Sequence, residues 1–270
     1  MYPRSGSLAA AWRLRITAQA SRLRTLAAPD DALVTSHVAE IDELGRTIAV
    51  AQRSIWSFAR FVPKDIVKGI IDSSISTELG GVRQEVTILF TDVTNFTGIA
   101  ESADPDSLMR QTSRHFAALT QAFLAEGGTV DKFIGDSVMV FWNAPHLQSD
   151  HVERACRAAL AAKAASEALN TQFEAEGLRP FAVRLGIHFG DAVVGNVGSV
   201  ERMNYTALGN SVNLAARLEA LNKEYGTTIL VSEAVRKRVE HCFRFKAIAS
   251  VIAKGMTTET QVYELVEAVA

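Results

Sequence analysis

The spacing of apolar residues divides the chain into a helical first part and a mixed second part. Over residues 41–62 the apolar positions follow alternating steps of three and four, an a/d seam of three heptads that is typical of a parallel coiled coil. An amphipathic helix that packs on its own domain would show a similar spacing. Pro63 interrupts the pattern. We therefore predict a helical segment over residues 1–80, with a coiled coil at about 41–62 and a short helix at about 63–72.

After residue 80, short strand-like runs alternate with longer helical periods, which indicates one mixed domain over residues 81–270. The predicted elements are a strand at 86–93, a helix at about 105–126, a hairpin at 129–142, a helix at about 149–176, strands within 181–199, a helix at about 210–225, a strand at 227–231, a short helix at about 232–240 and a last sheet section to 264. Asp104 or Asp106 can cap the first helix, and two glycines at 127 and 128 can end it. This βαββαβ order predicts an α+β fold of the ferredoxin-like type, with helices on one face of the sheet.

Two aspartates lie beside apolar runs of this domain. Asp92 comes near the end of the strand-like run 86–93, and Asp136 lies in the turn of the hairpin. Carboxylates at strand tips can converge on divalent metal, and their hard oxygen atoms suit Mg²⁺ or Mn²⁺. A metal pair about 3.5–4 Å apart is a recurrent device for displacement at phosphorus. Aspartate is also common in turns, so the meaning of this pair depends on the residues around it.

Composition and charge narrow the class of protein. The 270 residues are 48% apolar and 21% charged with a net charge of −2, which fits a soluble globular protein and gives no sign of a nucleic-acid partner. Cys156 and Cys242 lack the spacing of metal ligands and fit reduced thiols in the cytosol. No stretch approaches the roughly 18 apolar residues of a membrane-spanning helix. The first 25 residues contain arginines and no acidic residue. Such a segment can lie next to a membrane surface, for example after an upstream membrane segment. We expect a cytoplasmic location.

Four stretches of the second part resemble, in the same order, the catalytic domain of class III nucleotidyl cyclases. They are LFTDVTNFT at 89–97, DKFIGD at 131–136, LGIHFG at 185–190 and NYTALGNSVNLAARLE at 204–219. The resemblance runs from about residue 85 to the C-terminus. It implies an adenylate cyclase, in which the ribose 3′-oxygen of ATP attacks the α-phosphorus and 3′,5′-cyclic AMP and pyrophosphate are formed.

The resemblance also implies which residues carry the chemistry. Asp92 and Asp136 would hold two Mg²⁺ or Mn²⁺ ions per site, with the backbone carbonyl of Val93 as a further ligand. Asn213 would orient the ribose, and Arg217 would meet the α-phosphate in the transition state. These two residues are four apart on one predicted helix and therefore share a face, and a planar guanidinium with five donors suits phosphate oxygens.

Three further positions match nucleotide contacts of the family. Lys132 and Thr206 match the residues that read the purine, and a lysine there favours ATP because it can donate to adenine N1. Many adenylate cyclases have aspartate at the second position. Thr206 resembles a subgroup with threonine, some members of which respond to bicarbonate, and a hydroxyl discriminates bases less sharply. Lys254 resembles a lysine that contacts the β- and γ-phosphates, although Met256 replaces a second lysine often found nearby.

The resemblance implies a homodimer with shared active sites, because the metal pair of one chain would face the base-reading and transition-state residues of the other. The segment around residue 41 resembles the second helix of a HAMP signalling module, and the first HAMP helix is expected within 8–27. The short helix after Pro63 resembles the transducer that precedes many bacterial cyclase domains. We therefore expect the N-terminal helices to regulate activity.

Two other functions stay open at this point. A guanylate or mixed purine cyclase would share most of these residues. A catalytically silent, nucleotide-binding regulatory module would share the fold, although such a protein is expected to have lost the metal aspartates or the Asn213–Arg217 pair. A diguanylate cyclase or a polymerase palm domain would have a different signature in the hairpin turn from the Lys-x-x-Gly-Asp found here.

Overall fold

The structure is a computed structural model, and it describes residues 39–72, 75–199, 201–252 and 259–269 together with five isolated positions near the N-terminus. Contacts divide the chain into a small unit, Met1–Thr77, and a large unit, Glu78–Ala270. Lys254 and most of the segment expected to form the first HAMP helix lie outside the described residues. In the part that is described, no helix is both long and apolar enough to cross a membrane.

The small unit contains two described helices, α2 at Ala39–Phe58 and α3 at Lys64–Ile71. The predicted seam lies on α2, and its side chains Leu44 and Phe58 are 49% and 68% exposed. The helix ends at Phe58, before the predicted end of the coiled coil at 62, and a turn leads to Pro63, the residue before α3. Ile41, Ile48 and Ile55 of the seam are only partly exposed. Pairing of this helix with a second chain stays a prediction.

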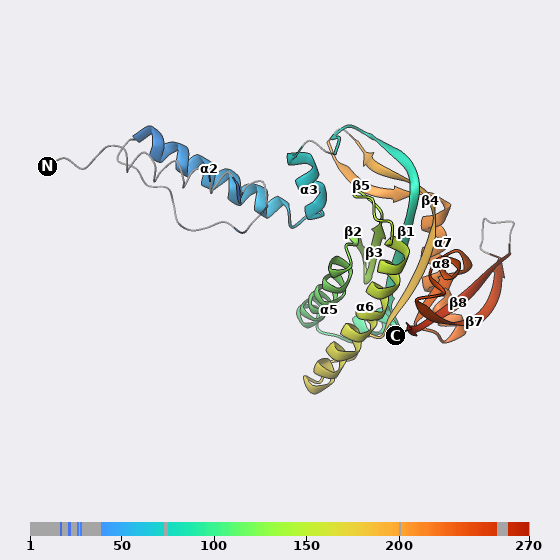
Figure 1. Ribbon diagram of the computed structural model, residues 1–270. Coiled ribbons are helices and arrows are strands. Elements are labelled where there is room, and N and C mark those ends of the chain that lie inside the picture. Colours follow the sequence, from blue (N-terminus) through green and yellow to red (C-terminus); the bar gives the residue numbers. More distant parts are fainter. Residues whose placement is uncertain are drawn as a thin grey trace. The chain divides into compact units, whose positions relative to one another are not determined.

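The large unit is built on an eight-stranded sheet (Figure 1). Its strands are β1 Gly80–Val93, β2 Thr129–Ile134, β3 Ser137–Trp142, β4 Val183–Gly198, β5 Met203–Leu208, β6 Ile229–Ser232, β7 Phe243–Ile252 and β8 Glu259–Ala268. The strand order is β2-β3-β1-β4-β6-β8-β7, with β5 paired to β4 beside this path. The first four strands therefore have the antiparallel 2-3-1-4 arrangement of a ferredoxin-like fold, which confirms the predicted class.

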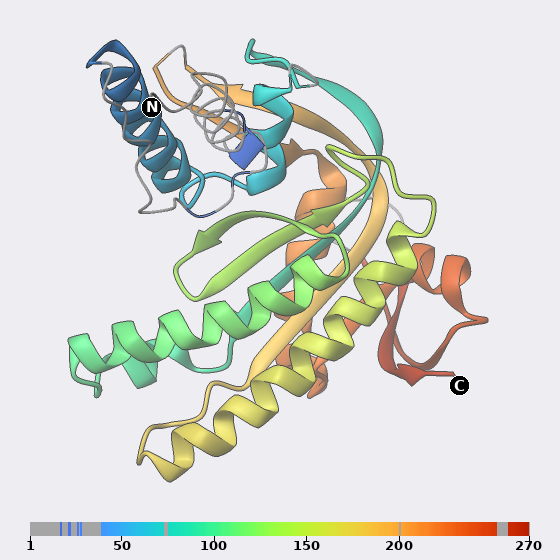
Figure 2. The same ribbon diagram turned by 60° about the vertical axis from the view of Figure 1, so that its left-hand side comes forward.

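Helices cover both faces of this sheet. The helices of the large unit are α4 Phe96–Ala100, α5 Pro105–Ala125, α6 His151–Ala175, α7 Asn210–Tyr225 and α8 Glu233–Val239. As predicted, α5 and α6 lie side by side on one face (Figure 2). Helix α7 packs on the opposite face, so the expectation of helices on a single face holds only for the βαββαβ part. Strand β5 and helix α4 were not predicted.

The ends of α5 show the predicted local chemistry. Of the two candidate caps, Asp104 is the one used, since its carboxylate accepts a hydrogen bond of 2.9 Å from the backbone N–H of Ser107. At the other end Gly127 has φ of +71°, a left-handed conformation that glycine adopts without strain. The N–H of Gly128 then donates to the carbonyl of Phe123 over 2.9 Å, which closes the helix and starts the hairpin.

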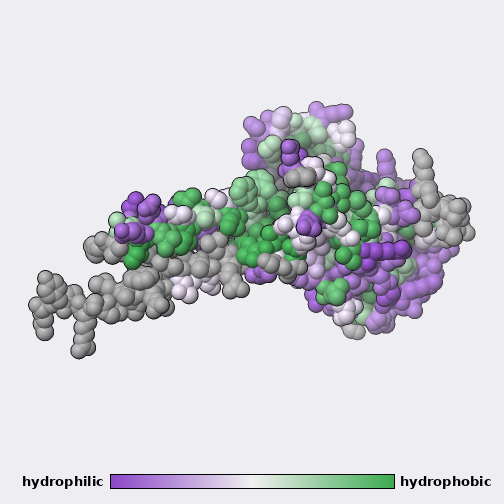
Figure 3. Space-filling model, turned by 90° about the horizontal axis from the view of Figure 1, so that it is seen from above, coloured by the Kyte–Doolittle hydropathy of each residue, from purple (hydrophilic) through white to green (hydrophobic). Residues whose placement is uncertain are grey.

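One end of the sheet extends beyond the helical layers as an arm made by β5 and the adjoining ends of β1 and β4. The backbones pack closely here, because a Cβ at Gly195 would lie 2.1 Å from the carbonyl oxygen of Gly80. The arm carries five exposed apolar side chains, with exposed fractions of 39–68%: Val82, Val193, Val197, Met203 and Leu208. Figure 3 looks down on this end and shows apolar surface there. An apolar arm of this kind is suited to an interface.

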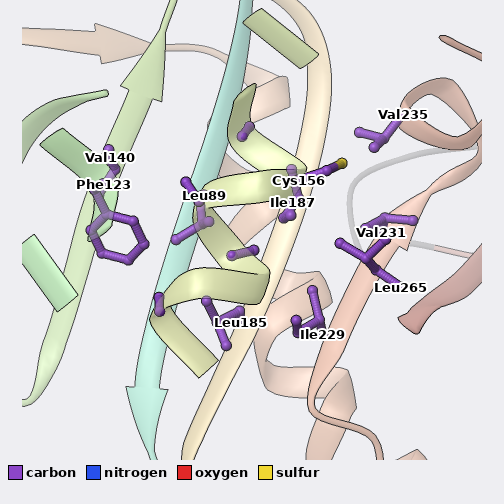
Figure 4. Packing of buried hydrophobic residues seen from close by; sticks show 14 of the residues in the cluster. Leu89, Phe123, Val140, Cys156, Leu185, Ile187, Ile229, Val231, Val235 and Leu265 are labelled. Atoms are coloured by element: carbon purple, nitrogen blue, oxygen red, sulfur yellow. The ribbon is translucent and has the colours of Figure 1, made fainter. Parts of the chain in front are cut away.

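The main core lies between the sheet and the layer of α5, α6 and α8 (Figure 4). Leu89 of β1 and Ile187 of β4 point into this layer and contact side chains such as Phe123 and Cys156, all with 0% exposure. The neighbouring residue Ile88 points to the other face, toward α7. This alternation is the period of two expected for a strand covered on both faces. Each fully buried side chain of this size contributes about 1.5–3 kcal/mol.

Helix α7 approaches β4 unusually closely at Gly186. A Cβ at this position would lie 2.1 Å from the backbone nitrogen of Glu219 and 2.5 Å from the backbone oxygen of Ala215. Neither atom can move away by a side-chain rotation. The glycine therefore sets the distance between helix and sheet, and with it the position of every residue that α7 presents.

We expect Gly186→Ala to lower the free energy of unfolding by about 3 kcal/mol, because the added methyl group overpacks against backbone. The thermal midpoint should fall by roughly 6–12 °C in circular dichroism melts. Gly98→Ala is the matched control, since its Cβ would meet only the side chain of Asn95, and it should change stability by about 1 kcal/mol or less. Equal melting of both variants would contradict this account of the helix–sheet contact.

Candidate active site

The structure brings Asp92, Val93 and Asp136 together at one edge of the sheet. Asp92 lies near the end of β1, and Asp136 lies in the turn between β2 and β3. Because β3 pairs with β1, the turn comes to rest beside the end of β1. The backbone N–H of Val93 donates to Oδ2 of Asp136 over 3.0 Å. The two carboxylates that the sequence singled out therefore lie side by side.

This arrangement places negative charges close together at some cost. Partial burial raises the pKa of Asp136 above its ordinary value, and the nearby charge of Asp92 raises it further, while the N–H of Val93 acts in the opposite direction. Ser137 donates its hydroxyl to Asp92 over 3.2 Å. Two crowded carboxylates beside the backbone carbonyl of Val93 fit a divalent cation. Among the described residues no third His, Cys, Asp or Glu side chain joins them in a metal-ligating cluster.

Arg184 is a site residue that the sequence reasoning missed. It lies directly opposite Asp92 in the β1–β4 register and forms an ion pair with that carboxylate. Its side chain is only 14% exposed, and its Nε lies 3.3 Å from Oε1 of Glu219 on α7. Burial raises the pKa of Glu219 to about 7, with the charge of Asp92 as the next cause. Arg184 could have been found only from the strand register, that is, from knowing which residues of β1 and β4 pair.

Lys132 and Thr206, the predicted base-reading residues, meet around one further side chain. Thr206 on β5 donates its hydroxyl to Oδ2 of Asp131, which neighbours Lys132 on β2. The ammonium group of Lys132 lies 3.6 Å from Oδ1 of the same carboxylate. Asp131 and Thr206 are 75 positions apart in the sequence, and the hydrogen bond joins β2 to β5. The structure thus places the two predicted residues in one location.

Asn213 and Arg217 lie on one face of α7, as their spacing predicts. Asn213 is exposed and Arg217 is half-buried, whereas Leu214 and Leu218, the residue after each of them, are buried against the sheet. Within the described part of the chain Arg217 has no acidic partner. No hydrogen bond or ion pair between described residues joins Asn213 or Arg217 to Asp92 or Asp136. The helix therefore presents a cation and an amide that are not used within the described chain.

Comparisons with known proteins point to one family. The family model described as "Adenylate and Guanylate cyclase catalytic domain" matches residues 81–267. The chain is 42% identical over 254 residues to Adenylate cyclase 1 of Rhizobium meliloti (strain 1021), covering 93% of this chain and 38% of that protein. It is 30% identical over 247 residues to an adenylate cyclase of Anabaena cylindrica, covering 87% of this chain and 47% of that protein. The chain therefore spans less than half the length of these relatives.

Solved structures show the same fold. The crystal structure of the adenylyl cyclase CyaB from P. aeruginosa matches with a TM-score of 0.66 and 30% identity, covering 70% of this chain and 97% of that one. The guanylyl cyclase Cya2 matches with a TM-score of 0.67 and 29% identity, covering 71% of this chain and 96% of that one. An adenylyl and a guanylyl cyclase are thus about equally similar in structure.

The crowded carboxylates lead to a prediction for Asp136→Asn, which keeps the oxygen that accepts from Val93 but removes the charge. A carboxyl with a raised pKa contributes stability that is fully present below its unfolded pKa and is lost as the pH rises through the folded pKa. At pH 7 the substitution should therefore stabilise the metal-free protein, by at most about 1 kcal/mol because solvent screens part of the effect.

Mn²⁺ should raise the thermal midpoint of the natural protein and have little effect on this variant. Thermal melts with and without Mn²⁺ at pH 7 measure both effects. Asp106→Asn, which removes an exposed charge in the first turn of α5, serves as the control and should keep the response to Mn²⁺. A destabilised Asp136→Asn, or one that Mn²⁺ stabilises as much as the natural protein, would contradict this description of the site.

Proposed function

The chain belongs to the adenylate and guanylate cyclase catalytic domain family, and we propose that it converts ATP to 3′,5′-cyclic AMP and pyrophosphate as a homodimer. The main support is the convergence of Asp92 and Asp136 next to the N–H and carbonyl of Val93. The similarity to two adenylate cyclases over most of this chain supports the same activity. The chain has both the metal aspartates and the Asn213–Arg217 pair, which argues against a catalytically silent regulatory module.

The proposed chemistry needs a nucleotide held in line and a charged transition state stabilised. Two Mg²⁺ or Mn²⁺ ions bound by Asp92, Asp136 and the carbonyl of Val93 would lower the pKa of the 3′-hydroxyl and neutralise charge on the triphosphate. Arg217 would donate its planar fork of N–H groups to the oxygens of the α-phosphate, where charge develops. Asn213 would hold the ribose so that its 3′-oxygen faces the phosphorus, and such positioning supplies a large part of the rate.

A second copy of the chain completes this site in our proposal. Among the described residues, Asn213 and Arg217 form no hydrogen bond or ion pair with Asp92 or Asp136, and helix α7 lies across the sheet from the α5–α6 layer. The arm of β1, β4 and β5 offers exposed apolar side chains to a partner. A two-fold axis would then create two equal sites, each with the carboxylates of one chain and the donors of the other.

ATP is the proposed substrate because Lys132 can donate to adenine N1, an acceptor that guanine lacks at that position. Guanylate or mixed purine cyclase activity is the second candidate, favoured by the equal structural similarity to the guanylyl cyclase Cya2. Contact of Lys254 with the β- and γ-phosphates, regulation through the HAMP-like helices and a bicarbonate response stay proposals. So do a cytoplasmic location and a place near a membrane.

The proposed activity is tested by identifying the product. Purified protein with Mn²⁺ should form cyclic AMP from ATP, and it should form cyclic GMP from GTP at a lower rate. Chromatography identifies and quantifies both products. Asp92→Ala should lower kcat/KM for ATP by about 10³-fold, because one carboxylate ligand is lost at the point where charge must be neutralised. Cyclic AMP formation that this substitution leaves unchanged would contradict the metal site, and GTP turnover equal to or above that of ATP would favour the second candidate.

Shared sites predict complementation between two inactive variants. Asp136→Asn mixed with Arg217→Ala should recover about a quarter of the natural activity, because half of the dimers are mixed and each mixed dimer has one intact site of two. The control mixture of Asp136→Asn with Asp92→Ala should stay inactive, since both changes affect the same half of the site. An inactive first mixture, shown by differential tagging to contain mixed dimers, would contradict the shared site.

A further inference from the structure

Asp131 is a carboxylate that contacts Lys132 and Thr206 but has no part in the proposed chemistry. On β2 its neighbours Val130 and Lys132 pair with consecutive residues of β3, so Asp131 is the extra residue of a β-bulge. A bulge turns a side chain away from the regular alternation and is common next to active sites. Here the side chain of Asp131 is turned to a buried position with 2% exposure.

The burial of this carboxylate has an energetic cost. Desolvation raises the pKa of Asp131, while the hydroxyl of Thr206 and the charge of Lys132 oppose the shift. An asparagine would have nearly the same shape without the cost of burying a charge. A buried carboxylate that contacts both residues at the base-reading position is therefore better explained by what it does to them than by stability.

The hydrogen bond to Asp131 decides what the hydroxyl of Thr206 offers to a ligand. A hydroxyl has one proton to donate and two lone pairs. An ionised carboxylate can only accept, so Thr206 spends its proton on Asp131. Only lone pairs remain for a base. Adenine presents an amino group at its 6-position, a donor, whereas guanine presents an oxygen there, an acceptor.

We propose that Asp131 is a positioning residue that sets the nucleotide preference by fixing the hydroxyl of Thr206 as an acceptor. The 6-amino group of adenine then donates to Thr206, and the 6-oxygen of guanine meets lone pairs. This inference rests on the proposed function, in which Lys132 and Thr206 contact the purine. The same carboxylate lies 3.6 Å from the ammonium group of Lys132, so it also holds the donor that faces adenine N1.

The test is Asp131→Asn, whose side-chain amide can donate to Thr206 as well as accept from it, so the hydroxyl proton is no longer committed to position 131. Values of kcat/KM are measured for ATP, GTP and purine riboside triphosphate, which has hydrogen at the 6-position and keeps N1. We expect the ratio of ATP to GTP to fall about tenfold. The ratio of ATP to purine riboside triphosphate should fall as well, and because both keep the N1 acceptor for Lys132, this second ratio isolates the 6-position.

A double-substitution cycle identifies Thr206 as the residue through which Asp131 acts. Thr206→Val should lower the preference for ATP by itself, and Asp131→Asn should not change the ratios further in that background. Thr206→Ser keeps a hydroxyl and should retain the preference. Asp106→Asn, an exposed aspartate on α5, is the matched control and should leave all three values unchanged.

Equal loss with all three nucleotides in Asp131→Asn would overturn the proposal, because a purely structural tie between β2 and β5 would act on every substrate alike. Partial misfolding does not change the ratios of kcat/KM between nucleotides, because inactive protein lowers kcat/KM for every nucleotide by the same factor. If Asp131→Asn does not fold, an unchanged preference in Thr206→Val overturns the proposal instead. If the natural protein forms no cyclic product, the proposed function fails, and the same ratios of dissociation constants with Mn²⁺ decide the role of Asp131.

Discussion

The antiparallel pairing of β1 with β4 is the constraint on which the rest of the structure depends. The ladder runs over all fourteen residues of β1, from Gly80 opposite Asn196 to Val93 opposite Val183. Because side chains alternate along a strand, one register sets which residues enter the α5–α6 layer and which face α7. The same register places Arg184 opposite Asp92. A slip by one residue would expose the core and dismantle the site together, so the fold and the site depend on the same pairing.

The site concentrates negative charge, and the fold would be more stable without it. The carboxylates of Asp92 and Asp136 lie close together, and the carboxyl of Glu219 is near enough to feel Asp92. Arg184, the hydroxyl of Ser137 and the N–H of Val93 offset only part of this charge. An excess of negative charge at one sheet edge is what a site for divalent cations requires, and its cost is borne by the packed sheet around it.

Periodicity in the sequence predicted most of the large unit, and the misses have physical reasons. Helix α4 has only five residues, too few to establish a helical period. Strand β5 is no shorter than β2 or β3, but the alternation of apolar and polar residues in its sequence MNYTAL is broken by the apolar pair at its end. Asp92 and Asp136 were recognisable because each lies next to an apolar run within a stretch that resembles the cyclase family. Arg184 and Asp131 were not, because their roles depend on a long-range register and on a bulge, neither of which is visible in the local sequence. The seam on α2 was visible, but pairing requires a second chain.

Threonine at position 206 raised the question of how a hydroxyl distinguishes adenine from guanine. An aspartate at this position, as in many members of the resembling family, can only accept a hydrogen bond and so selects the amino group of adenine. In this chain the carboxylate belongs instead to Asp131, which accepts the hydroxyl proton of Thr206. In our proposal Thr206 then offers the base only an acceptor. An isolated threonine hydroxyl can donate or accept, which is why threonine alone predicts weak discrimination between adenine and guanine. Once its proton is spent inside the protein, the hydroxyl can be as selective as a carboxylate, without placing a second negative charge beside the nucleotide.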